Sequence, residues 1–150
     1  MYQLKIFILC FFCSLLFVSG NHMRHTRESK DTINTTDIMT KCNQTFPIKI
    51  EYLHDLNTTG SFSDESEKVP MCYVHCYLTK IGVMGEENQI NSERAANFYE
   101  IEDEDMIDDC NNEMVAASIS DSCAKAYFFL RCLMTRAMID NKNRDEDAVK

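Results

Sequence analysis

The stretch Met71-Cys72-Tyr73-Val74-His75-Cys76-Tyr77-Leu78 carries two cysteines four residues apart. It lies within the segment 69–84, the most apolar part of the chain after residue 20. Residues four apart share one face of an α-helix, so these cysteines are better placed to bond two other segments than each other. Pro70 fits the first turn of such a helix, and Gly82 and Gly85 mark its end. The stretch therefore predicts a central helix over 69–84.

A second pair of cysteines, Cys123 and Cys132, lies nine residues apart in the segment 122–138. Nine residues are about two and a half helical turns, so the two thiols point to opposite sides of a helix. This helix, capped by Ser120-Asp121, is therefore expected to be bonded on both flanks. The Cys123 side carries an apolar stripe that fits a core or the lining of a cavity: Ala126, Tyr127, Leu130, Leu133 and Met134.

The remaining segments alternate between helical patterns and polar connections. Further helices are predicted over 36–46, 48–56, 91–99 and 103–114. Thr36-Asp37 and Asn91-Ser92 supply caps for two of them, and the acids of 103–105 suit a first helical turn. Residues 57–67 are mostly Thr, Ser, Gly, Asp and Glu, which predicts a loop. Because no alternating strand pattern is convincing, the predicted fold class is all-α.

The composition favours a helical protein of an oxidising compartment. The chain has 150 residues with only 4 glycines and 2 prolines, fewer than β-rich folds usually use in turns. Its formal charge of −9, without a basic run, argues against nucleic-acid binding, because phosphate contacts need Lys and Arg. The 8 cysteines are too many for an ordinary cytosolic domain of this size.

Residues 1–20 have the pattern of a secretory signal peptide. Lys5 precedes an almost wholly apolar run, and Val18-Ser19-Gly20 offers small residues for cleavage. The alternative is a membrane anchor, but the run is shorter than the roughly 20 residues that a spanning helix needs. No later segment is apolar enough to span a bilayer. We expect a secreted protein with a signal peptide 1–20, a flexible arm 21–35, a helical domain 36–139 and a charged tail 140–150.

Three sequons, at Asn34, Asn43 and Asn57, fit the acceptor pattern for N-glycosylation. They support secretion, although such triplets also occur by chance in proteins that carry no sugar. The three asparagines are therefore glycosylation candidates.

The six cysteines that remain after cleavage are separated by 29, 3, 33, 12 and 8 residues. An even number in a secreted chain implies three disulfides. This joint spacing, with the segments Met71–Leu78 and Ser122–Tyr127, resembles the insect odorant-binding protein family over residues 36–138. The resemblance implies six α-helices around an apolar cavity. It also implies that the first cysteine bonds the third, the second the fifth and the fourth the sixth: Cys42–Cys76, Cys72–Cys123 and Cys110–Cys132.

Three features depart from that family. The 33-residue gap is slightly short, which predicts a tight turn after the central helix. Sequons are unusual in a small odorant carrier. The tail after Ile139 is charged, whereas some members have an apolar C-terminus that folds over the cavity, so gating by the tail is not expected here.

No catalytic or metal-binding arrangement is supported by the residues. His75 follows Cys72 by three, as in secreted phospholipase A2, but the adjoining Asp and the Gly-rich calcium loop of that chemistry are missing. A zinc site from Cys72, His75 and Cys76 competes with disulfide formation, which prevails in a secreted chain. The acidic run 100–109 lacks the glycine that an EF-hand loop needs at its sixth position. We therefore predict neither an enzyme nor a cofactor or metal site.

The apolar side chains of the predicted helices favour a binding function. Methionine is abundant after residue 38, and its flexible side chain suits an adaptable cavity. The predicted ligand-binding residues combine one side of the central helix with positions on its neighbours: Ile38, Val74, Leu78, Ile81, Met84, Tyr99, Met106, Leu130, Leu133 and Met134. Tyr52, Tyr99 and Tyr127 are candidates to orient the polar end of a ligand. The alternative is that all these side chains pack a dry core.

Together these features predict a secreted carrier of small hydrophobic molecules, odorants or pheromones, in chemosensory lymph. The expected partner is a small apolar ligand, and a chemosensory receptor or a second copy of the chain are further candidates. The alternative function is that of a salivary or reproductive-tract relative that scavenges amines or lipids. An amine scavenger should place an acid in its cavity, and Glu104 and Asp108 are the nearest acids, although helix geometry puts them outside.

Overall fold

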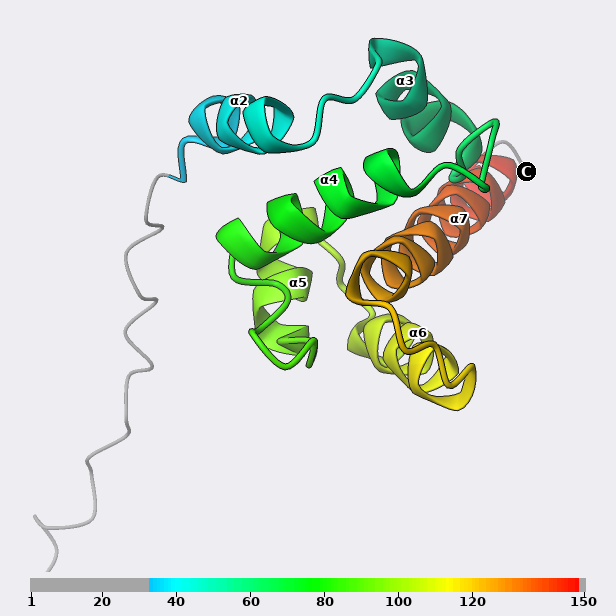
Figure 1. Cartoon of the computed structure of the whole chain (residues 1–150). Coiled ribbons are helices and arrows are strands. Elements are labelled where there is room, and N and C mark those ends of the chain that lie inside the picture. Colours follow the sequence, from blue (N-terminus) through cyan, green and yellow to red (C-terminus); the bar gives the residue numbers. More distant parts are fainter. Residues whose placement is uncertain (1–32, 149–150) are drawn as a thin grey trace, which may run out of the picture. The chain divides into compact units, whose positions relative to one another are not determined.

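The structure, a computed structural model, describes residues 33–148. The predicted signal peptide and the predicted arm up to residue 32 lie outside the described residues. Figure 1 shows the helices of the described part in chain order. They are α2 (Thr35–Thr45), α3 (Ile50–Thr59), α4 (Lys68–Lys80), α5 (Ser92–Tyr99), α6 (Glu104–Ala116) and α7 (Ser122–Ala148). The predicted all-α fold with six helices is confirmed.

The two helices predicted to carry two disulfide bonds each, α4 and α7, organise the packing. α4 contacts α7 and α2, whereas α7 also contacts α6 and α3, and α5 contacts α6. Three disulfides follow the same contacts. Cys42 and Cys76 join α2 to α4 with an S–S distance of 2.04 Å, and Cys72 and Cys123 join α4 to α7 at 2.05 Å. Cys110 and Cys132 join α6 to α7 at 2.00 Å, so the three pairs are those that the family resemblance implies.

Side-chain caps begin four of the helices. Asn34 accepts a hydrogen bond from the Asp37 N–H at 3.1 Å, so α2 begins at Thr35 and its cap is not the predicted Thr36-Asp37. Asn91 caps α5 as predicted, and Asp103 and Asp121 accept from backbone N–H groups in the first turns of α6 and α7. Each cap satisfies a donor that would otherwise lack a partner in the helix.

The helix α3 starts and ends later than predicted. The Asn43 side chain accepts from the Ile48 N–H at 2.9 Å, which holds the turn before the helix. At the other end, the Gly60 N–H donates to the carbonyl oxygen of Leu56 at 3.1 Å, so α3 continues through Thr59. The predicted loop 57–67 therefore begins only at Gly60, whose φ of 78° favours a residue without a Cβ.

The helix α4 ends at Lys80, four residues before the predicted end at Met84. The chain reverses at Gly82, which has a φ of 77°. The N–H groups of Val83 and Met84 both donate to the Leu78 carbonyl oxygen, so the apolar residues after the helix fold back onto its last turn. Periodicity alone does not separate such a turn from a continuing helix.

The segment after Ile139, which the sequence predicted to be a charged tail beyond the helix 122–138, is helical and continues α7 to Ala148. Arg144 pairs with Asp140 one turn earlier at 3.2 Å and donates to Asn141 at 2.6 Å. No glycine or proline interrupts residues 122–148. Charged residues four apart support a helix, so a high charge density does not by itself end one.

The core of the described chain is apolar and contains no buried charged or polar residue. Its largest fully buried side chains come from α4 and the turn after it, from α6 and from α7: Phe129, Leu78, Ile81, Met84, Ile107 and Leu133. Among the helices of residues 33–148, none combines the length and the apolar composition that crossing a membrane requires.

Candidate ligand-binding site

Most of the predicted ligand-binding residues lie in the shared core of α4 and α7. Six of them are at most 6% exposed: Val74, Leu78, Ile81, Met84, Leu130 and Leu133. The first four come from α4 and its C-terminal turn, and the last two come from α7, which contacts α4 directly. These six residues are called the apolar set below.

The other four predicted residues lie at the margin of this core. Ile38 on α2, Tyr99 at the end of α5 and Met134 on α7 are partly exposed. Met106 on α6 is also partly exposed, and it lines an open surface hollow. The structure thus brings the apolar set together and leaves these four residues around it.

Two surface hollows of the described chain have charged walls. One, of about 360 Å³, is lined by Met106 and Ile139 and by Asp103, Asp105, Asp109, Arg136, Asp140 and Asn143. The other, of about 490 Å³, is lined by Thr59, Ser61, Glu65, Glu113, Phe128, Arg131, Cys132, Thr135 and Arg136. Because small apolar ligands are bound in largely enclosed apolar sites, neither hollow suits such a ligand.

Tyr99 carries a buried hydroxyl without a hydrogen-bond partner among the described residues. It is the last residue of α5, and the chain turns at Glu100 with a φ of 55°. Burial raises the pKa of the Tyr99 phenol, and the neighbouring phenol Tyr77 on α4 raises it further. The hydroxyl therefore stays protonated and neutral throughout the physiological pH range.

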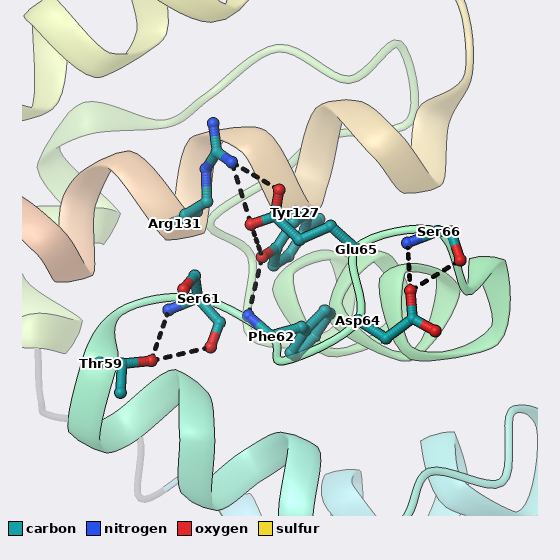
Figure 2. A network of polar contacts seen from close by, with 8 residues as sticks. All are labelled: Thr59, Ser61, Phe62, Asp64, Glu65, Ser66, Tyr127 and Arg131. Atoms are coloured by element: carbon teal, nitrogen blue, oxygen red, sulfur yellow. Dashed lines mark hydrogen bonds and ion pairs between the residues drawn. The ribbon is translucent and has the colours of Figure 1, made fainter.

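Tyr127, another tyrosine predicted to orient a ligand, uses its hydroxyl within the protein. The hydroxyl donates to Glu65 Oε1 at 2.7 Å and accepts from the Phe62 N–H at 2.9 Å, as Figure 2 shows. The rings of Tyr127 and Phe62 stack with centroids 4.3 Å apart, and Tyr52 packs edge-on against Phe62 at 5.3 Å. Burial, and then the hydrogen bond to Glu65, raise the pKa of Tyr127 to about 12. This tyrosine is a structural anchor for the segment after α3.

Glu65 completes the same network through Arg131 on α7. Arg131 Nη1 donates to both Glu65 oxygens, at 3.0 and 2.8 Å (Figure 2). The hydrogen bond from Tyr127 is the main cause that lowers the pKa of the Glu65 carboxyl below its usual range. Burial of the carboxyl opposes this shift, and the hydrogen bond and charge of Arg131 add to it. These contacts hold the segment 60–67, called the docking loop below, against α7.

The sequence did not predict that the docking loop is bound to α7. Glu65 and Arg131 are 66 residues apart, so no helical or strand spacing relates them. The docking loop approaches α7 closely at Gly60, where a Cβ would lie 3.2 Å from the Thr135 backbone. The glycine at the end of a helical pattern was the one local signal for this turn.

His75 and the two cysteines around it have structural roles in the described chain. The His75 Nε2 atom is 3.2 Å from the Asn88 Oδ1 atom and holds the turn after α4. Cys72 and Cys76 belong to different disulfides, so neither thiolate is available to a zinc ion. This arrangement agrees with the interpretation of His75 as a histidine with a satisfied ring nitrogen.

The family comparison agrees with this fold. Residues 24–136 match the model of the PBP/GOBP family. General odorant-binding protein 84a of Drosophila melanogaster is 26% identical over 115 residues, which cover 76% of this chain. The matched region spans 64% of that relative's length. No solved structure is significantly similar. The chain belongs to the PBP/GOBP family, the insect odorant-binding protein family that its cysteine spacing resembles.

Proposed function

We propose that this protein is a secreted carrier of small hydrophobic molecules, odorants or pheromones, in chemosensory lymph. Family membership is the observation that carries the proposal. The name of the Drosophila relative, a general odorant-binding protein, supports the same ligand class. Three disulfides suit an extracellular protein, because such bonds persist where the surroundings are oxidising.

The proposed ligand site is formed by the apolar set together with Ile38, Tyr99, Met106 and Met134. Four of the six members of the apolar set come from α4 and its C-terminal turn, and the other two face them from α7. Burying a small apolar molecule among such side chains gains about 25 cal/mol for each Å² of apolar surface removed from water. Three of the proposed residues are methionines, whose flexible side chains suit ligands of varied shape: Met84, Met106 and Met134.

Scavenging of amines has less support than carriage of apolar molecules. A buried ammonium ion needs a carboxylate beside it, because an unpaired charge is costly to bury. Asp108 is exposed and accepts a hydrogen bond from the Ser92 hydroxyl at 2.7 Å, between α6 and α5. No acidic side chain is buried among the described residues.

The direct test is mass spectrometry of small molecules extracted from the protein purified from its native tissue. The expected result is a neutral or weakly polar hydrophobic compound that displaces an apolar fluorescent probe from the same protein. Recovery of amines, with no displacement of the probe by hydrophobic compounds, would contradict the carrier function. Sequencing the N-terminus of the purified protein tests secretion, since a chain beginning at Asn21 is expected after cleavage.

A further inference from the structure

The Tyr99 hydroxyl is a buried polar atom that the fold leaves unsatisfied. It has less than 1 Å² of exposed surface and no hydrogen-bond partner among the described residues. A buried hydroxyl without a partner is unfavourable, because it has given up its hydrogen bonds to water. Proteins retain such a group where something outside the polypeptide completes it, so Tyr99 points to a bound molecule.

Tyr99 belongs to an aromatic cluster that includes Tyr77 of α4. Its ring packs edge-on against Phe98 with centroids 5.1 Å apart, and Phe98 packs edge-on against Tyr77 of α4 at 6.3 Å. Tyr77 directly precedes Leu78, which is fully buried in the apolar set. The aromatic cluster therefore joins the end of α5, with its unsatisfied hydroxyl, to Tyr77 of α4.

No charged side chain is buried among the described residues, so the surroundings of the hydroxyl offer no buried charge to an ionic ligand. Within residues 33–148, the one ionisable side chain that contributes to the raised pKa of Tyr99 is the phenol Tyr77. Both phenols are neutral near pH 7, because burial raises the pKa of each. A neutral O–H donor without a neighbouring cation fits an uncharged oxygen acceptor, whereas a carboxylate would be buried without a compensating positive charge.

We propose that Tyr99 donates a hydrogen bond to a neutral oxygen acceptor of the bound ligand, such as the carbonyl of a ketone, an aldehyde or an ester. This inference rests on the proposed carrier function and adds the ligand class to it. The apolar set supplies binding energy that does not depend on the ligand's polar group. Tyr99 then distinguishes oxygenated molecules from hydrocarbons of the same shape.

The test compares two ligands that differ only at the acceptor: a medium-chain methyl ketone and the 2-methyl-1-alkene in which a CH₂ group replaces the carbonyl oxygen. The full chain is expressed in a secreting host and purified with its disulfides intact, and each ligand is measured by displacement of an apolar fluorescent probe. Tyr99→Phe should weaken ketone binding about three- to tenfold and leave alkene binding unchanged. The matched control is Tyr127→Phe, which removes a hydroxyl already paired inside the protein and should not discriminate between the two ligands.

Thermal melting separates a ligand-binding hydroxyl from a structural one. Without ligand, Tyr99→Phe should melt at the same temperature as the wild type or higher, because it removes an unpaired buried polar atom. The carboxylate of the same chain length should bind the wild type more than about tenfold more weakly than the ketone.

Three results would overturn the inference. Equal effects of Tyr99→Phe on the ketone and the alkene would mean that a water or a packing contact, not the ligand, satisfies the hydroxyl. A carboxylate that binds as tightly as the ketone would remove the selection for a neutral group. If neither the ketone nor the alkene displaces the probe from the wild type, the carrier function fails as well, and this outcome is distinct from the other two.

Discussion

Tyr127 lies in a region that stabilises the fold, whereas Tyr99 lies in the region proposed to bind a ligand. The Tyr127 hydroxyl has both an acceptor, Glu65, and a donor, the Phe62 N–H. The Tyr99 hydroxyl is buried without either among the described residues. The hydroxyl of Tyr127 thus completes a hydrogen-bond network within the protein. The hydroxyl of Tyr99 is instead proposed to bond a ligand.

The surrounding elements differ in the same way. Around Tyr127, the docking loop is held by stacked rings and by an ion pair between Glu65 and Arg131. Around Tyr99, the neighbours are aromatic: its ring packs on Phe98, which packs on Tyr77 of α4. A polar network that is fully satisfied rigidifies a fold, whereas an unsatisfied group in apolar surroundings is typical of a functional site.

The largest expected effect tests whether the regions around Tyr127 and Tyr99 both depend on the disulfide between α4 and α7. The disulfide between Cys72 and Cys123 joins α4 to α7, and Tyr127 lies one turn after Cys123. Replacing both cysteines by alanine should lower the free energy of unfolding by about 2–5 kcal/mol, because the unfolded chain regains freedom. Chemical denaturation monitored by circular dichroism measures this loss. An unchanged midpoint would show that the packing of α4 against α7 holds both regions without the bond.

A second substitution tests the region proposed to bind the ligand. Leu78→Trp should block uptake of an apolar probe more than it destabilises the protein, because the indole would occupy ligand space beside α4. Leu78 is fully buried, so a filled core would respond by losing about 1–3 kcal/mol of stability to overpacking. Probe displacement and thermal melting are measured together. Unchanged probe binding with a clearly lower melting temperature would identify Leu78 as ordinary core and place the ligand elsewhere.

A third substitution tests the stabilising region around Tyr127. Tyr127→Phe should lower the free energy of unfolding by about 1–3 kcal/mol, because the buried Phe62 N–H loses its acceptor and Glu65 loses a donor. The matched substitution Tyr99→Phe should cause no loss. Thermal melting of both variants measures the contrast directly. If the two substitutions lowered stability equally, the distinction between the tyrosines would be wrong.

The smallest expected effect concerns pH. Hydrogen bonding from Tyr127 and the Arg131 charge lower the pKa of Glu65 from its ordinary value of 4.5. A carboxyl whose pKa is lower in the folded state contributes stability above its unfolded pKa and loses it as the pH falls through the folded pKa. The melting difference between wild type and Glu65→Gln should therefore stay constant from pH 7 to about pH 5 and shrink only below the ordinary pKa. A difference that already disappears at pH 5 would mean that the docking loop is not held by an ionised Glu65.

The sequence alone determined the helices and the family. Cysteines four and nine residues apart on apolar helical patterns required a central helix and a last helix with bonds on both sides, because helix geometry converts spacing into direction. The joint spacing of the six cysteines then identified the family, which residues 24–136 confirm. Burial of Val74 and Leu78 on α4 and of Leu130 and Leu133 on α7 was also readable from the sequence, since burial of one helix face follows from the 3.6-residue period.

Only the tertiary structure decided how the polar side chains are used. Tyr52, Tyr99 and Tyr127 were equal candidates in the sequence, and their difference depends on partners that are far along the chain, such as Glu65 for Tyr127. The turn at Gly60, the end of α4 before Gly82 and the continuation of α7 to Ala148 likewise depend on contacts or competing hydrogen bonds that no local period encodes. Local patterns set which face of a helix is buried, but the hydrogen-bond partner of a buried hydroxyl is set by which distant segment packs against it.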